Sequence, residues 1–108
     1  MHYASFHGNV EMIKSLIEHG ADIHATNRDG SSVMHIAAQG DEPISLYFFK
    51  SIGVSVMPKD RKNSTPLHWA AYSRSETAMN YLLAWGADPN AQDDQGLTPL
   101  HLAVKSVE

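Results

Sequence analysis

Four histidines stand at one fixed interval of 33 residues in this chain. They are His2, His35, His68 and His101. Three glycines keep the same interval: Gly20, Gly53 and Gly86. A strict period of this length indicates that one structural unit is copied along the chain. A residue that recurs once in each unit serves the architecture of that unit, so the periodic histidines are poor candidates for a unique catalytic base.

The residues around each periodic histidine repeat as well. Two of the units read Thr65-Pro66-Leu67-His68-Trp69-Ala70 and Thr98-Pro99-Leu100-His101-Leu102-Ala103, and Gly-Ala-Asp recurs at 20–22 and 86–88. These motifs resemble the ankyrin repeat, whose hallmark is T-P-L-H-x-A, and the resemblance spans the whole chain. It implies an all-α fold, an ankyrin-repeat solenoid of stacked helix–turn–helix units with projecting hairpin fingers.

The physical chemistry of the repeated residues predicts the same elements. Thr65 can cap a helix by accepting a hydrogen bond from a first-turn N–H, and Pro66 suits the first helical position. Gly86 and its equivalents can end helices in the left-handed conformation. We therefore expect helices at roughly 1–7, 10–19, 33–40, 42–52, 66–73, 76–85 and 99–106, and fingers at 21–31, 54–64 and 87–97. Two apolar sets should face inward: Ile13, Leu16 and Ile17, then Met79, Leu82 and Leu83.

The repeat also predicts the domain organisation. We expect a single ankyrin-repeat domain over 1–108, with a partial repeat at 1–26, full repeats at 27–59 and 60–92, and a partial repeat at 93–108. Terminal repeats of solenoids need polar outer faces, whereas Met1, Leu100 and Leu102 would lie at uncapped ends. We therefore interpret the chain as a fragment of a longer array.

Composition narrows the class of protein. The formal net charge of -4 argues against general affinity for nucleic acid. Cysteine is absent from the sequence, which excludes disulfides and thiolate metal sites. No apolar run approaches the roughly 20 residues of a membrane span, so direct membrane insertion is not expected of this segment. These features predict a cytoplasmic location.

The histidines and carboxylates do not form a recognisable catalytic or metal-binding pattern. The periodic histidines should lie about 10 Å apart along the stack, as packed helical layers do, which is too far for shared ligation of one metal ion. His7, His19 and His24 lack a His or Glu partner three or four residues on. Gly-rich phosphate loops and the G-x-S-x-G and H-E-x-x-H motifs are missing. We predict no enzyme activity, no cofactor and no metal, and assign the periodic histidines to backbone hydrogen bonds at the helix–finger junctions.

The unit at 27–59 departs from the repeat in two ways. Its finger carries Val54-Ser55-Val56-Met57-Pro58, and thus loses the carboxylate and amide that other fingers use as ties. Its second helix should leave Ile44 and Tyr47 on the outer surface, where other units have polar residues. This patch is either a pair of sporadic exposed apolar side chains or a contact with other domains of the parent chain.

The next finger is unusually basic. Lys59, Arg61 and Lys62 cluster at its tip, with Asp60 among them. Nucleic acid or phospholipid could attract such a cluster, but the acidic chain favours a solvated tip, and a docking site for an acidic peptide is a third interpretation.

Ankyrin repeats bind partners through finger tips and the exposed surface of first helices, so the resemblance implies a set of candidate positions. They are Arg28, Asp29, Ser31, Gln39, Arg61, Lys62, Ser64, Trp69, Tyr72, Asp94, Gln95 and Leu97. Trp69 and Tyr72 lie three residues apart on one helical face, and both types often carry binding energy. Trp69 could instead pack between helices. We predict a partner-binding set of Gln39, Trp69, Tyr72, Arg61, Lys62 and Arg28.

A narrower resemblance concerns the parent protein. Four runs of residues look like the ankyrin region of DHHC-type protein palmitoyltransferases: Ala37-Ala38-Gln39-Gly40-Asp41, Ser45-Leu46-Tyr47-Phe48-Phe49, Asn63-Ser64-Thr65-Pro66-Leu67-His68-Trp69-Ala70-Ala71-Tyr72 and Tyr81-Leu82-Leu83-Ala84-Trp85. That resemblance implies a cytosolic domain that recruits protein substrates for a membrane enzyme. The sequence thus predicts a protein–protein interaction module that binds an extended segment of a protein or peptide in its concave groove. The alternative is a structural spacer within a long ankyrin array, without a dedicated ligand.

Overall fold

The computed structural model describes residues 10–41 and 43–106. In chain order the helices are α2 (Val10–Glu18), α3 (Val33–Gln39), α4 (Pro43–Ser51), α5 (Pro66–Tyr72), α6 (Glu76–Ala84) and α7 (Pro99–Ser106). No strand occurs in this described part of the chain. The expected helices from 10–19 onward are confirmed to within one residue at each end, and the one expected at 1–7 lies outside the described residues.

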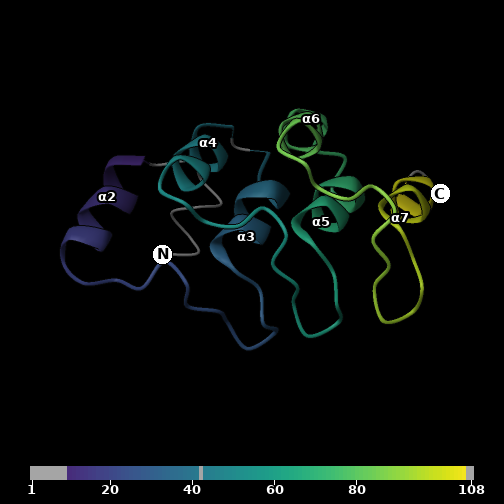
Figure 1. Ribbon diagram of the computed structural model, residues 1–108, viewed down its shortest axis with the longest axis horizontal. Helices are drawn as coiled ribbons and strands as arrows, with labels where there is room; N and C mark the ends of the chain where they lie inside the picture. Colours follow the sequence, from purple (N-terminus) through teal and green to yellow (C-terminus); the bar gives the residue numbers. More distant parts are fainter. Residues whose placement is uncertain (1–9, 42, 107–108) are drawn as a thin grey trace.

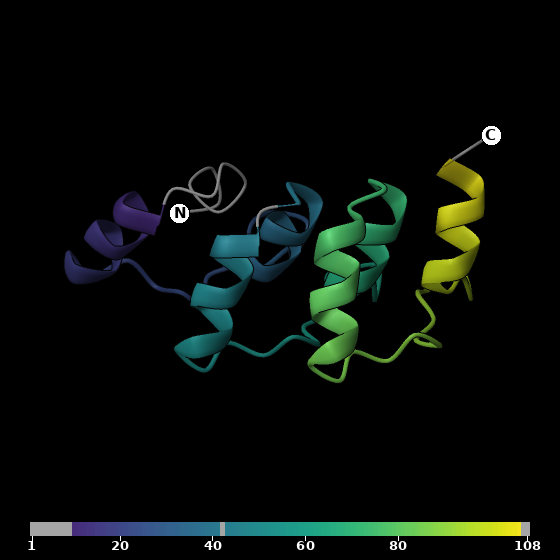
Figure 2. The ribbon, with the colours of Figure 1, turned by 90° about the horizontal axis from the view of Figure 1, so that it is seen from above.

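The helices stack side by side in two layers. α3, α5 and α7 form one layer, α4 and α6 lie above them, and the loops project from the lower side as fingers (Figure 1). Seen from above, α3 with α4 and α5 with α6 form successive pairs along the long axis (Figure 2). We name 21–31 the first finger, 54–64 the second and 87–97 the third. This is the all-α ankyrin solenoid that the sequence predicts.

Local residue chemistry explains where the helices begin and end. Thr65 caps α5: its hydroxyl accepts a hydrogen bond from the His68 backbone N–H, and the Thr65 backbone N–H donates one to Nδ1 of the His68 ring in return. Ser32 and His35 make the same reciprocal pair at the start of α3, so serine replaces threonine there without loss of the cap. Gly86, just after α6, has φ +95, in the region where a side chain is strained.

Each buried histidine joins its own unit to the next finger. The His35 Nε2 atom lies 2.8 Å from the Ser64 carbonyl oxygen, and the His68 Nε2 atom lies 2.9 Å from that of Leu97. In both rings Nδ1 accepts from a backbone N–H, so the ring proton is on Nε2 and is donated to the carbonyl. The structural role predicted for these histidines at the helix–finger junction is confirmed for His35 and His68.

The core runs through the whole stack. Its largest fully buried side chains include Phe49, Ile13, Met34, Leu46 and Leu82. The prediction that Leu83 faces inward is wrong, because its side chain is 42% exposed. Leu83 lines a shallow apolar groove together with Leu100 of α7, on the side of α6 where no further described helix packs.

Two further expectations concern the unit at 27–59. Ile44 and Tyr47 do lie on the outer surface of α4, 63% and 67% exposed. The second finger lacks the carboxylate and amide of the repeat pattern, as predicted, but it keeps an equivalent hydrogen bond. The Ser55 hydroxyl accepts a hydrogen bond from the Met57 backbone N–H at 3.1 Å, just as Asp88 accepts one from Asn90 in the third finger. The Ser55 hydroxyl therefore makes the hydrogen bond that a carboxylate makes in the third finger.

Candidate functional site: a cleft between the fingers and the first helices

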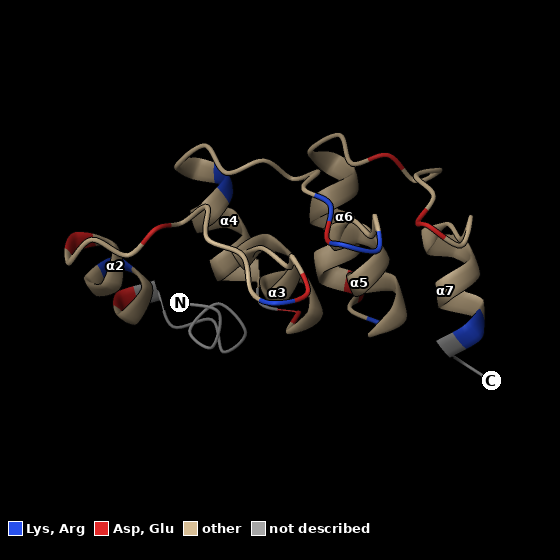
Figure 3. Cartoon of the chain, turned by 90° about the horizontal axis from the view of Figure 1, so that it is seen from below, with Lys and Arg blue, Asp and Glu red and all other residues tan. Residues whose placement is uncertain are grey.

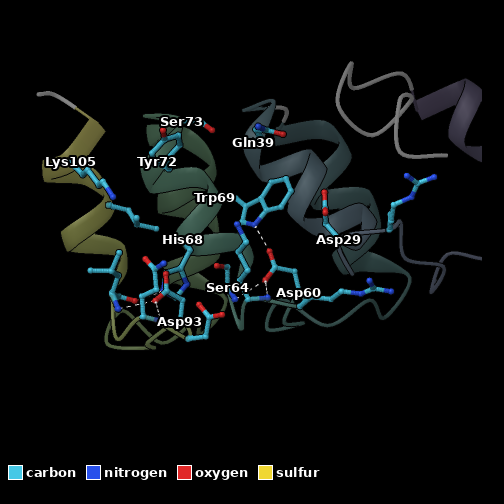
Figure 4. A pocket seen from close by; sticks show the side chains of 17 residues that line it. Asp29, Gln39, Asp60, Ser64, His68, Trp69, Tyr72, Ser73, Asp93 and Lys105 are labelled. Atoms are coloured by element: carbon cyan, nitrogen blue, oxygen red, sulfur yellow. Dashed lines mark hydrogen bonds between the residues drawn. The ribbon is translucent and has the colours of Figure 1, made fainter.

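A cleft of about 640 Å³ lies between the fingers and the layer formed by α3, α5 and α7, the first helix of each unit. Side chains from α3, α5, α7 and all three fingers line it, and the close-up shows them converging on one hollow (Figure 4). The whole predicted partner-binding set lines it: Arg28, Gln39, Arg61, Lys62, Trp69 and Tyr72. Ser31, which the family pattern also suggested, is fully buried and is not among the lining residues.

Trp69 forms part of the wall of this cleft. Its side chain is partly buried, and its ring packs edge-on against the ring of His35, with centroids 5.3 Å apart. The indole Nε1 atom donates a 3.0 Å hydrogen bond to Oδ2 of Asp60 (Figure 4). Trp69 is therefore packed against His35 on one side and lines the cleft as well.

Tyr72 and Gln39 stand at the far end of the cleft from the finger tips, near the ends of their helices (Figure 4). The Tyr72 side chain is 58% exposed, and Gln39 is exposed as well. The carbonyl of Gln39 accepts a 3.2 Å hydrogen bond from the Ser75 hydroxyl, which ties the end of α3 to the turn before α6. The Gln39 backbone is thus held by the next unit, and its side chain is left at the cleft.

Main-chain hydrogen bonds hold the finger tips together. The Arg61 backbone N–H donates to the Asp29 carbonyl at 3.0 Å, and the Asp94 backbone N–H donates to the Lys62 carbonyl at 2.8 Å. Gly30 lets the first two tips approach, because a Cβ there would lie 3.0 Å from the backbone nitrogen of Arg61. The row of tips is therefore a fixed edge of the cleft.

Charge changes sign along this edge. The first tip carries Arg28 beside Asp29, the second carries Arg61 and Lys62, and the third carries Asp94 (Figure 3). Lys105 of α7 adds a cation on the helical side. The cleft thus offers an aromatic wall and a rim in which a basic tip stands next to an acidic one.

The importance of Asp60 and Asp93 was missed by the sequence analysis. Both line the cleft, and each uses Oδ1 to accept two backbone N–H groups of its own finger: Lys62 and Ser64 for Asp60, Gln95 and Leu97 for Asp93. Their spacing of 33 residues was the available signal. It was obscured because Asp60 stands inside a cluster of basic residues at the finger tip.

The described part of the chain also bears on two other classes of site, a metal site and a membrane span. No cluster of three or more His, Asp or Glu side chains there has a geometry that could hold a metal ion. None of the described helices combines the length and apolar character that crossing a bilayer requires.

Comparison with known proteins gives the family. A family model described as ankyrin repeats (3 copies) matches residues 1–93. The Notch-regulated ankyrin repeat-containing protein of Xenopus tropicalis is 48% identical over 48 residues, which is 44% of this chain and 42% of the relative. The human protein of the same name matches with the same identity and coverage. The potassium channel SKOR of Arabidopsis thaliana is 44% identical over 48 residues, 44% of this chain and 6% of the channel.

The chain spans less than half the length of the Notch-regulated relatives that it matches. The family model, by contrast, covers most of the chain, and the stack of paired helices with fingers is the structure expected of it. Ankyrin repeats in general bind other proteins. The chain belongs to the ankyrin-repeat family.

Proposed function

We propose that this domain binds an extended segment of a partner protein in the cleft between the fingers and α3, α5 and α7. The observation that carries the proposal is convergence: six residues chosen from the sequence, on two fingers and two helices, line one cleft of about 640 Å³. That volume falls within the usual range for binding sites, roughly 300–1,000 Å³. An extended segment suits a cleft that runs across several repeats.

Trp69 is the proposed anchor. The equivalent positions in the neighbouring repeats hold Ile36 and Leu102, so the fold needs only an apolar side chain there. The indole is larger than the side chains that serve at the equivalent positions. It faces the cleft beside the exposed ring of Tyr72. Truncation of a buried aromatic anchor to alanine typically lowers the free energy of binding by about 2 kcal/mol or more.

Selection of displayed peptides on the intact domain tests the proposal. Selected peptides should bind the unmodified domain, and Trp69→Ala should weaken them about 30-fold or more. Tyr47→Ala is the matched control, since Tyr47 is an exposed aromatic outside the cleft. Circular dichroism must show that both variants are folded. Equal binding by Trp69→Ala, or unfolding caused by it, would show that Trp69 belongs to the core and that the cleft is not the site.

We also infer, from the sequence resemblance to the ankyrin region of DHHC-type palmitoyltransferases, that the partners are substrates of such an enzyme, recruited at the cytosolic face of a membrane. The coding sequence downstream of codon 108 is the direct test. Hydrophobic spans and a Cys-rich segment containing Asp-His-His-Cys would support the inference. A downstream sequence without them would remove it and leave the cleft proposal intact.

The alternative is a structural spacer within a longer ankyrin array, and one observation favours a longer array. The apolar groove beside α7 is lined by residues that include Leu83, Leu100 and Ala103. One unit earlier, α6 packs in the equivalent place, and there Leu67 and Ala70 are buried. A spacer would have this groove covered by the next unit and would bind no peptide in the cleft, so the peptide selection separates the two functions.

A further inference from the structure

The three fingers share one turn, built around a residue at the same place in each. Asn27, Asp60 and Asp93 each use Oδ1 to accept the backbone N–H groups two and four residues later, at 2.9–3.0 Å. Asparagine and aspartate are therefore equivalent in this task, since a single oxygen performs it. The turn leaves the second side-chain oxygen of an aspartate available for another partner.

Only the second finger has a side-chain donor placed for that second oxygen among the three described turns. Oδ2 of Asp60 accepts the indole N–H of Trp69 at 3.0 Å. The equivalent of Trp69 is Ile36 for the first finger and Leu102 for the third, and neither carries a side-chain donor. The charged acceptor and the large aromatic thus occur together in one unit.

The ring of Trp69 is fixed on a second side as well. His35 packs against it at 62° between ring planes, and His35 is itself fully buried and hydrogen-bonded to Ser64. A hydrogen bond to a carboxylate is stronger and more directional than one between neutral groups. Together the two contacts set both the position and the tilt of the indole before any ligand arrives.

We infer that Asp60 is a positioning residue: it holds the indole of Trp69 so that the cleft offers a ring face instead of a hydrogen-bond donor. The inference rests on the proposed function of the cleft. With its N–H already engaged, Trp69 can hold a ligand only through its π surface. The segment it takes should therefore place an apolar side chain, rather than a polar acceptor, against Trp69. Preorganisation of this kind lowers the entropy lost when a complex forms.

Asp60→Asn tests the positioning role without removing the turn. Asparagine has one acceptor oxygen, so it can serve the turn or the indole but not both, and Asn27 shows that it serves the turn. Asp93→Asn is the matched control, because it makes the same change in a finger without a tryptophan partner. Both changes are made on Trp85→Phe, which leaves Trp69 as the single indole.

The first measurement needs no ligand. Nuclear magnetic resonance of the indole N–H should show that solvent exchange of the Trp69 proton becomes roughly tenfold faster or more in Asp60→Asn, and stays unchanged in Asp93→Asn. If the Asp60→Asn protein keeps the exchange rate and chemical shift of the parent, Asp60 does not hold the indole and the inference fails. Loss of folding in Asp60→Asn with a folded Asp93→Asn would also overturn it, since the residue would then be structural.

The second measurement uses a peptide selected on the unmodified domain. Asp60→Asn should weaken it roughly three- to tenfold when residue 69 is Trp, and should have little further effect in a Trp69→Phe background, where there is no N–H to hold. An equal loss in both backgrounds contradicts a role that acts through Trp69. If no peptide is selected at all, the proposed function fails, while the exchange experiment still decides whether Asp60 positions the indole.

Discussion

Asp41 caps a helix that belongs to the next structural unit. Its Oδ1 atom accepts a 2.9 Å hydrogen bond from the backbone N–H of Ala78, in the first turn of α6. The residue just before that helix, Ser75, makes no side-chain cap and instead donates its hydroxyl to the Gln39 carbonyl. The two units thus exchange partners: one supplies the cap of α6, and the other satisfies a carbonyl at the end of α3.

Replacement of Asp41 should therefore weaken the contact between units. Asp41→Ala should lower the free energy of unfolding by about 1–2 kcal/mol, because it removes a helix cap and places alanine at a positive φ of 52. Asp41→Asn keeps an acceptor and a residue type that tolerates this backbone, and should cost only a few tenths of a kcal/mol. Urea denaturation measures both. Equal stability of the two variants would show that the bond to Ala78 contributes nothing.

Gly30 and Gly96 give a matched pair for the finger contact. Both have φ +76, but a Cβ at Gly30 would lie 3.0 Å from the Arg61 backbone nitrogen, whereas a Cβ at Gly96 would meet no atom within 4 Å. Each change to alanine should cost about 1 kcal/mol for the backbone strain. Gly30→Ala should cost more in thermal denaturation, because the first two tips must also separate. Identical melting temperatures would contradict the close approach of these tips.

His68 should stabilise the folded domain and should not bind zinc. His68→Ala leaves the Thr65 N–H and the Leu97 carbonyl without their partner, and should destabilise the domain by about 2–4 kcal/mol. His101→Ala is the control, since His101 is exposed and makes the local cap with Thr98, without a bond to a later finger among the described residues. His101→Ala should lower the free energy of unfolding by less than His68→Ala does. Calorimetry with zinc should show no stoichiometric binding that His68→Ala abolishes, and the appearance of such binding would overturn the structural assignment.

The Arg61 side chain should raise the association rate of a partner peptide and should leave its dissociation rate almost unchanged. Its backbone N–H bonds to Asp29, so Arg61→Ala preserves the contact between tips and removes only the exposed guanidinium. Rim charges mainly change the association rate and its dependence on salt. For a selected peptide with an acidic residue near the second tip, stopped-flow measurements should show slower association at low salt and almost none of that difference at high salt. A change confined to the dissociation rate would place Arg61 inside the bound contact.

The fold could be predicted from the sequence because its signals are local and repeated. A capping residue, Ser32 or Thr65, starts the first helix of a unit, and a glycine such as Gly86 follows the end of the second. Even the helix ends were therefore predicted to within one residue. Leu83 was misplaced because periodicity shows which face of a helix is apolar without showing whether another helix covers it. Burial of a side chain depends on which other helix packs against it, and the sequence of a single helix does not carry that information.

The residues of the cleft could be predicted in the same way, but the bond between two of them could not. Trp69 stands out by size against Ile36 and Leu102. Asp60 lies nine residues earlier in a different element, and nothing in the spacing says that its second oxygen meets the indole. Ser55 illustrates the same limit, since a hydroxyl replaced the expected carboxylate without disturbing the turn.

The bonds that join neighbouring finger tips use main-chain atoms only, Arg61 N–H to Asp29 carbonyl and Asp94 N–H to Lys62 carbonyl. Gly30 and the turn residues Asn27, Asp60 and Asp93 are needed to form this edge. At the four residues that make the main-chain bonds, its geometry is consequently independent of the side chain, proline excepted. Arginine, lysine, aspartate or glutamine can replace one another at positions 29, 61, 62 and 94 without removing the main-chain bonds between the tips. New preferences for a partner can therefore arise one substitution at a time, while the scaffold that presents them keeps its shape and its stability.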